Sequence, residues 1–417
     1  MKVHRLVTAE GKAIKLEEVI GMNNNFKQLS CAAGSLAVFR NLLEDDVIKS
    51  LWQLLGIPAE DTSGLVYHYS GFVSKLYQKN ICLSKYILKS VLEDENFYIL
   101  AKSQGKDVSP VVEKSVENEL RILQELSRVT SAELKAEIGY DGWLPEWENS
   151  EIDFLGEYRS RVENIDKFGY GMYSKYFMFI VRDGKVTPVK HPDTQRLSEL
   201  YGYERERSAV MNNTLALLDG KPAQNVLLYG DAGTGKSSTV KAIANELAPR
   251  GLRLIEVTKE QLRDIPHIID SITKNPLKFI LFIDDLSFAA GEDCFGALKA
   301  TLEGSVSARA DNIAIYATSN RRHLVKETFS DREGDDIHRN DTIQELISLS
   351  ARFGLTVSFS KPDKKSYIRI VTELAREKGI EMEEDELSIK AEAFALRGSG
   401  RSARTAKQFV NQLVNEK

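Results

Sequence analysis

The fold of this chain is decided by one stretch, Gly230-Asp231-Ala232-Gly233-Thr234-Gly235-Lys236-Ser237, which matches the phosphate-binding pattern G-x-x-x-x-G-K-[S/T]. An apolar strand, Asn225–Tyr229, precedes the stretch, and an amphipathic helix, Lys236–Leu247, follows it. In that setting the glycines allow backbone N–H groups to turn toward phosphate oxygens, and the helix directs the positive end of its dipole at them. The alternative is a chance glycine-rich loop, and the flanking strand and helix argue against it.

This loop makes ATP and Mg²⁺ the expected ligands. We expect the ammonium of Lys236 to reach the β- and γ-phosphates and the hydroxyl of Ser237 to ligate Mg²⁺. The other residues from Gly230 to Ser238 would hold the phosphates through backbone N–H groups.

Two further apolar strands end in polar side chains suited to the same site. The strand Phe279–Ile283 runs into Asp284 and Asp285. We expect Asp284 to hold the magnesium, through water or Ser237, and Asp285 to orient and help deprotonate the attacking water. The next strand runs into Asn320, which we expect to hydrogen-bond that water or the γ-phosphate. Strands often end in acidic or amide turn residues, so the order of these motifs after the loop is what favours the catalytic interpretation.

Strands and helices alternate from residue 196 to 360, where Leu252–Val257 and Leu355–Phe359 are additional apolar runs. Strands that are apolar on both faces and separated by helices predict an α/β domain with a parallel sheet covered on both sides. After residue 361 the strands stop, and helical periodicity predicts three helices: Lys364–Lys378, Asp385–Leu396 and Arg401–Asn415.

The first half of the chain is of another kind. Apolar residues at spacings of three and four predict a mainly helical domain, with helices over Ala33–Leu43, Gly64–Gln78, Leu83–Leu100 and Val111–Leu126. Near residues 176–189 a β-hairpin is expected, because Asp183-Gly184 supplies the positive φ of a tight turn. We therefore predict three domains: 1–195 for a partner or for regulation, 196–360 for ATP, and 361–417 as a helical lid.

Composition narrows the class of protein. The 417 residues are 42% hydrophobic and 28% charged, with a net charge of −5, so no global basic field indicates nucleic-acid binding. Cys31, Cys82 and Cys294 are scattered, which favours idle thiols in a reducing compartment over a disulfide or metal site. The N-terminus has no apolar signal region and no apolar run is long enough to span a bilayer, so we expect a cytoplasmic protein without membrane contact.

The order of these motifs resembles the AAA+ ATPase superfamily. That resemblance implies a parallel five-stranded sheet followed by the helical lid. Within the superfamily, Leu200–Gly220, the run Asp284-Asp285-Leu286-Ser287-Phe288 and Leu349–Phe359 resemble a bacterial AAA+ family known as a domain of unknown function. Replication initiator and helicase-loader ATPases share the stretch at 350–355 in similar form.

The resemblance assigns roles to residues that spacing alone would leave as surface charges. Tyr203, with Tyr201 nearby, falls where AAA+ proteins pack on adenine. Arg352 matches the arginine finger, which acts in trans on the γ-phosphate of the neighbouring subunit, and so implies a homo-oligomer. Arg401 resembles the lid arginine that senses nucleotide, with Arg404 one helical turn further on; favourable helix-surface charge is the alternative for both.

Three departures from the family pattern bear on catalysis. The usual pair is Asp-Glu, whereas Asp285 has the shorter side chain, and Glu292 in the next loop could supplement it. Ala351 stands where relatives carry an acidic residue. The mixed-charge insertion between Asn320 and Leu349 is expected to be a solvated loop, with a subunit or partner contact as the alternative.

The sequence thus predicts an oligomeric Mg-ATPase that remodels or loads a macromolecular partner, with a protein partner favoured over nucleic acid. An ATP-binding switch or scaffold with little turnover is the first alternative, and a nucleic-acid loader is the second. A small-molecule kinase is disfavoured. Such a kinase would carry its substrate lid as an insertion within the sheet domain, whereas in this chain the helical segment follows the last strand.

Overall fold

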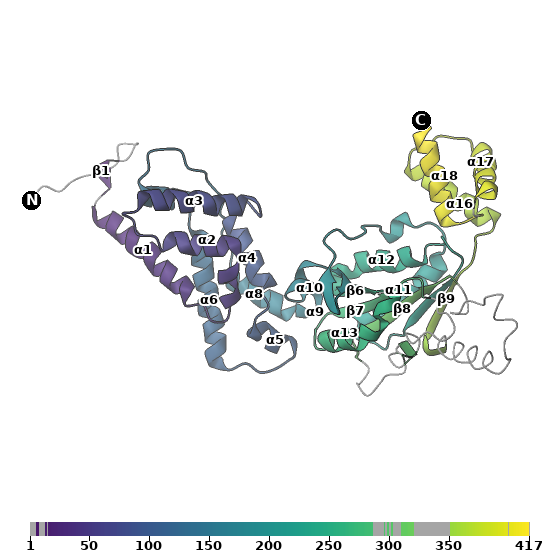
Figure 1. Cartoon of the computed structure of the whole chain (residues 1–417), viewed down its shortest axis with the longest axis horizontal. Helices are drawn as coiled ribbons and strands as arrows, with labels where there is room; N and C mark the ends of the chain where they lie inside the picture. The colour runs from purple at the N-terminus through teal and green to yellow at the C-terminus, as the bar shows by residue number, and fades with distance from the viewer. Residues whose placement is uncertain are drawn as a thin grey trace, which may run out of the picture. The chain divides into compact units, whose positions relative to one another are not determined.

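The computed structural model describes residues 6–7, 13–14, 16–286, 296, 298–299, 302, 310–320, 351–398 and 400–416, with side chains from residue 25 onward. These residues form two compact units (Figure 1). The first comprises Met1–Ile165 and Tyr170–Lys175, and the second comprises Asp166–Gly169 and Tyr176–Lys417. Glu292 and the charged insertion at 321–349 lie outside the described residues.

The first unit is helical, as predicted. Its elements are β1 (Leu6–Val7), β2 (Ala13–Ile14), α1 (Leu16–Gly34), η1 (Arg40–Glu44), α2 (Asp46–Leu55), α3 (Thr62–Tyr77), α4 (Leu83–Glu93), α5 (Phe97–Ser103), α6 (Pro110–Arg128), α7 (Ser131–Ile138), α8 (Phe154–Glu163) and α10 (Met172–Lys175), with α9 (Ile165–Phe168) at the boundary. Phe39, Tyr69, Phe72 and Phe154 are fully buried in a single apolar core.

Two predicted helices of this unit are broken by side chains that bind backbone N–H groups. The prediction of one helix over Ala33–Leu43 is wrong, because the carboxylate of Glu119 accepts the N–H groups of residues 37, 38 and 39, which ends α1 before η1 begins. The prediction of one helix over Leu83–Leu100 is also wrong, because Asn96 accepts the N–H of Ile99 and starts α5 separately from α4.

The second unit is built on a seven-stranded sheet of order β4-β3-β6-β7-β8-β5-β9. Its strands are β3 (Met178–Arg182), β4 (Lys185–Pro188), β5 (Val226–Gly230), β6 (Leu252–Val257), β7 (Lys278–Ile283), β8 (Ile313–Ser319) and β9 (Leu355–Phe359). The five neighbouring strands β6, β7, β8, β5 and β9 are parallel and match the predicted runs.

The sheet is wider than the predicted five strands because the hairpin joins it. Asp183 and Gly184 have φ of 49° and 70°, as the tight turn between β3 and β4 requires. Strand β3 pairs in parallel with β6, so the hairpin belongs to the sheet. The sequence predicts the first domain boundary at 195–196, whereas the two units divide at 175–176, because the hairpin finds its hydrogen-bond partners in the sheet.

Helices cover the sheet and continue into the lid. They are η2 (Leu197–Glu199), α11 (Glu204–Leu218), α12 (Lys236–Leu247), η3 (Ala248–Arg250), η4 (Lys259–Asp264), α13 (Ile265–Ile272), α16 (Lys364–Glu377), α17 (Glu384–Arg397) and α18 (Ala403–Asn415). Val210 of α11 and Ile243 of α12 share a core with Leu228 and Ile280 of the sheet. The lid helices enclose their own core around Tyr367.

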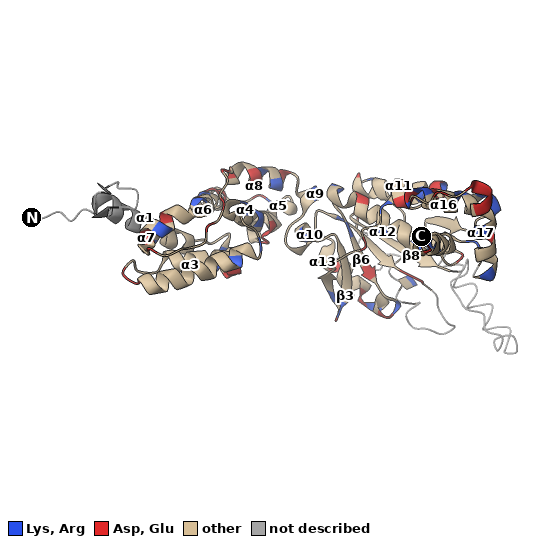
Figure 2. Cartoon of the chain, turned by 90° about the horizontal axis from the view of Figure 1, so that it is seen from above, with Lys and Arg blue, Asp and Glu red and all other residues tan. Residues whose placement is uncertain are grey.

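Basic and acidic residues are interspersed along the helices of both units (Figure 2). None of the helices in the described ranges is long and apolar enough to cross a membrane.

Candidate functional site

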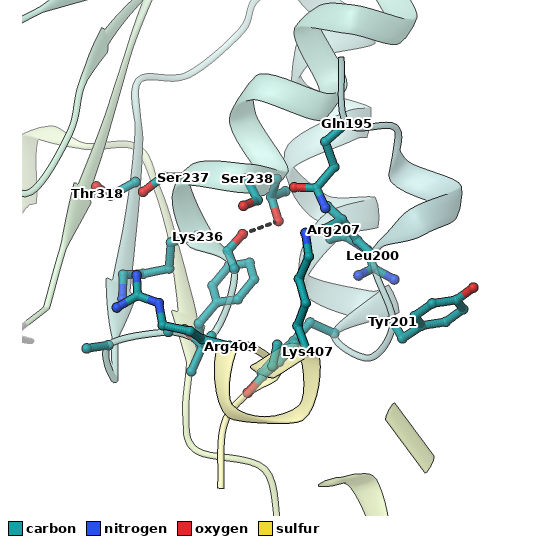
Figure 3. Close-up of a pocket in the computed structure, with 18 of the residues that line it drawn as sticks. Gln195, Leu200, Tyr201, Arg207, Lys236, Ser237, Ser238, Thr318, Arg404 and Lys407 are labelled. Carbon is teal, nitrogen blue, oxygen red and sulfur yellow. Dashed lines mark hydrogen bonds between the residues drawn. The ribbon is translucent and has the colours of Figure 1, made fainter. Parts of the chain in front are cut away.

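A cavity of about 500 Å³ opens where the phosphate-binding loop, the strand ends and the lid meet (Figure 3). Its lining includes most of the predicted site: Ala232, Gly233, Thr234, Gly235, Lys236, Ser237, Ser238, Asp284, Asp285, Asn320, Tyr203 and Arg404. Gly230, Asp231, Arg352 and Arg401 do not line it. Residues far apart in the sequence therefore converge on one cavity large enough for a nucleotide.

Glycines are required in the loop for two separate reasons. Gly230 pairs with Phe359 at the end of β9, and a Cβ at Gly230 would lie only 2.2 Å from the Phe359 carbonyl oxygen. Gly235 has φ of 93° where α12 begins, a conformation that side chains disfavour. The loop can therefore turn sharply from β5 into α12, which leaves the first N–H groups of that helix facing the cavity.

Lys236 is held across the loop by three acceptors. Its Nζ donates to the carbonyl oxygens of Gly230 at 3.0 Å and Asp231 at 2.8 Å, and to Oδ1 of Asn320 at 3.0 Å. Burial lowers the pKa of Lys236, while the carboxylates of Asp231 and Asp285 oppose that shift. These acceptors use all three N–H bonds of the ammonium, so a phosphate oxygen that enters the cavity would replace one of them and form a charge-assisted hydrogen bond.

Asp284 is surrounded by donors from three segments. Its Oδ1 accepts hydrogen bonds from the Ser237 hydroxyl at 2.6 Å, from the Thr318 hydroxyl, and from the backbone N–H of Asp285 at 3.1 Å. Parallel pairing of β7 with β8 sets Ile283 opposite Ala317, which brings Thr318 beside Asp284.

The oxygens of Ser237 and Asp284 fit magnesium. Mg²⁺ is usually held by one or two carboxylates together with substrate phosphates and water. In the described part of the chain no group of three or more His, Cys, Asp or Glu side chains forms a metal cage. A site made of one hydroxyl, one carboxylate and phosphate oxygens agrees with both observations.

Asp285 is held in a backbone conformation that is uncommon for its residue type. Its φ is 52°, in the left-handed region, and its N–H donates to Thr318 Oγ1 at 2.9 Å. Its Oδ1 accepts a hydrogen bond from Nδ2 of Asn320 at 2.7 Å. The side chain is therefore aimed into the cavity by contacts on both sides of the residue.

One end of the cavity is apolar and suits a flat base. The ring of Tyr203 lies on Phe359 with centroids 5.2 Å apart, and its hydroxyl donates to the Ser360 carbonyl oxygen at 2.7 Å. Burial raises the pKa of Tyr203 to about 12. Leu200, Tyr201, Ile370 and Leu374 also line the cavity. An aromatic face and aliphatic side chains offer stacking and apolar contact to an adenine ring.

The structure separates the two lid arginines. Arg404 lines the cavity, and its backbone N–H donates to the Gly233 carbonyl oxygen at 3.0 Å. Arg401 instead makes a two-pronged ion pair with Glu392 of α17, with distances of 2.8 and 2.6 Å. Of the two arginines predicted to sense nucleotide, only Arg404 therefore lines the cavity, whereas Glu392 engages the Arg401 guanidinium within the lid.

Several cavity residues have no role in the sequence-based prediction. Thr318 is one, and the small polar residues at the end of its strand were the signal for it. Gln195, Arg207 and Lys407 also line the cavity. Burial lowers the pKa of Arg207. No sequence pattern points to these three residues, because they come from a loop, from α11 and from α18, and only the folded chain brings them together.

The strand order, the phosphate-binding loop and the helical lid beside it form the α/β fold that the resemblance to AAA+ ATPases predicts. The chain belongs to the family described as "Protein of unknown function (DUF815)", whose family model matches residues 174–417. That match begins close to the boundary between the two units, so it covers the sheet and lid.

Sequence and structural similarities to individual proteins are more distant. Over 111 residues the chain is 30% identical to the replication factor C large subunit of Nanoarchaeum equitans (strain Kin4-M), and the match covers 25% of this chain and 25% of that protein. Among solved structures, the chain is similar to variants of Thermotoga maritima RuvB. One shares 17% identity at a TM-score of 0.38 over 53% of this chain and 64% of that one; a second shares 16% at 0.36 over 54% and 65%.

Proposed function

We propose that the protein binds Mg-ATP in this cavity and hydrolyses it as part of an oligomer. The observation that carries the proposal is the continuous set of contacts from Lys236 through Asn320 to Asp285, next to the Ser237–Asp284 pair. These are the groups needed to bind a γ-phosphate, to hold a divalent cation and to orient water, and they follow the C-terminal ends of the neighbouring strands β7, β8 and β5.

In this mechanism each side chain has a separate task. Lys236 and the loop N–H groups bind the phosphates, and Asp284 with Ser237 holds Mg²⁺, which supplies charge neutralisation on the phosphate oxygens. Asp285 accepts a hydrogen bond from the attacking water and orients it, while Asn320 fixes the Asp285 carboxylate. The Tyr203 ring and the aliphatic lid residues exclude water from the base.

The oligomer is proposed because of Arg352. It does not line the cavity of its own chain, although it matches the arginine finger of AAA+ proteins. A guanidinium delivered by a neighbour would stabilise charge on the transferring phosphoryl group.

We further propose that turnover remodels or loads a protein partner, and that the helical first unit selects this partner. We also propose that the protein acts in the cytoplasm, because scattered cysteines are typical of proteins in a reducing compartment.

Steady-state phosphate release by the purified full chain, measured with Mg-ATP over a range of protein concentrations, tests this proposal. We expect specific activity to rise with protein concentration, because the site is completed by assembly. No phosphate release at any concentration, together with tight ATP binding, would favour the alternative of a nucleotide switch. The short side chain of Asp285 is the observation that supports that alternative.

A nucleic-acid loader is the second alternative, favoured by the identity shared with the replication factor C large subunit. The interspersed charges of Figure 2 and the net charge of −5 favour a protein partner instead. A binding titration against single- and double-stranded DNA at increasing salt separates them, since phosphate contacts give a steep salt dependence.

A further inference from the structure

Lys407 is a second lid cation that faces the cavity. It lies three residues after Arg404 on α18, so the two side chains share one face of the helix. Both line the cavity. In Figure 3 the Lys407 side chain extends from the lid toward the start of α12. Among the residues that the structure describes, it has no hydrogen-bond or ion-pair partner to hold it there.

The two lid cations face different parts of the phosphate-binding loop. Arg404 packs at Gly233, and its charge acts on Lys236, the residue expected at the β- and γ-phosphates. Lys407 extends instead toward the first turn of α12, which contains Ser238. There the loop ends, and its N–H groups face the α- and β-phosphates.

We propose that Lys407 binds the α/β-phosphate region of the nucleotide, so that the lid holds ADP as well as ATP. This inference rests on the proposed function and adds to it. After the γ-phosphate leaves, Arg404 loses its nearest anionic contact, whereas Lys407 keeps its own. Release of ADP then requires the lid to withdraw Lys407 from the phosphates. A partner that moves the lid could therefore control nucleotide exchange.

The test measures dissociation constants of the full chain for ADP and for a non-hydrolysable ATP analogue by titration calorimetry. The variants are Lys407→Met, Arg404→Met and, as a matched control, Lys365→Met, which removes an exposed lid lysine outside the cavity. We expect Lys407→Met to weaken both ligands about tenfold, as for loss of one charge-assisted contact. Arg404→Met should weaken the analogue more than ADP, and Lys365→Met should weaken neither.

Lys407→Arg keeps the charge and is expected to restore ADP affinity to within about twofold of wild type, which shows that a loss in Lys407→Met is not misfolding. Unchanged ADP affinity in Lys407→Met would overturn the inference and leave the proposed function standing. Absence of any nucleotide binding by the wild-type chain would overturn both.

Discussion

Asn320 donates a hydrogen bond from Nδ2 to Oδ1 of Asp285 over 2.7 Å. The other end of the same amide, Oδ1, accepts from Nζ of Lys236 at 3.0 Å. One side chain at the end of β8 therefore connects the cation expected at the γ-phosphate with the carboxylate expected to orient water. A single amide thus links the two groups to which we assign phosphate binding and water orientation.

Replacing Asp285 with Asn is expected to separate binding from turnover. Asparagine tolerates the left-handed backbone at this position and can still accept the Asn320 hydrogen bond, so the loop should keep its shape. It cannot act as a base. We expect ATP affinity within about threefold of wild type and phosphate release reduced by about 10²-fold or more. Turnover at the wild-type rate would remove Asp285 from the mechanism. Proteins that co-purify with this variant in ATP would identify the partner.

Replacing Lys236 with Ala is expected to abolish nucleotide binding. The variant removes the ammonium that spans Gly230, Asp231 and Asn320, and it removes the main positive charge under the β- and γ-phosphates. We expect ATP affinity to fall by about 10²-fold or more, measured by calorimetry. Lys365→Ala, on the exposed side of the lid, is the matched control. Wild-type affinity in the Lys236→Ala chain would refute the phosphate assignment.

Arg352 is expected to act on the neighbouring subunit. Alone, Arg352→Ala should lower phosphate release by about 10³-fold without a comparable loss of ATP affinity. Mixing it with Asp285→Asn should restore part of the activity, because a subunit with intact Asp285 can then face a neighbour with intact Arg352. Mixed oligomers that form but stay inactive would place Arg352 in its own site or outside catalysis.

Replacing the two lid arginines is expected to have different effects. Arg404→Met should weaken binding of an ATP analogue about tenfold, because Arg404 lines the cavity. Arg401→Met should leave that affinity nearly unchanged and loosen the contact between α17 and the segment that precedes α18, since its guanidinium forms an ion pair with Glu392. Faster amide exchange in the lid would report the second effect. Equal losses of affinity in both variants would contradict the separation.

The carboxylate of Glu119 is expected to hold the turn between α1 and η1. It is buried and accepts the N–H groups of residues 37, 38 and 39. Glu119→Leu leaves those donors without an acceptor, at a cost of about 2–3 kcal/mol or more. Hydrogen exchange at these amides should accelerate accordingly. Glu117→Leu, on the same helix, loses only an exposed ion pair with Arg159 and should cost less than about 1 kcal/mol.

Much of the fold follows from local pattern. The strands β5 to β9 and the lid helices lie where periodicity predicts them, because buried parallel strands and amphipathic helices have distinct apolar spacings. The predictions of single helices over Ala33–Leu43 and Leu83–Leu100 are wrong because side chains accept backbone N–H groups there. The acceptor is the distant carboxylate of Glu119 in the first case and the local amide of Asn96 in the second. The spacing of apolar residues does not reveal such hydrogen bonds.

For the site, sequence alone determined the loop at 230–237, the Asp284–Asp285 pair and Asn320, because phosphate and magnesium chemistry restricts which residues can stand at these spacings. Tertiary structure alone decided which lid arginine faces the cavity, that the hairpin widens the sheet, and that Thr318, Arg207 and Lys407 line the cavity. These residues come from elements far apart in the chain, and their proximity depends on strand register and helix packing, which motif spacing does not encode.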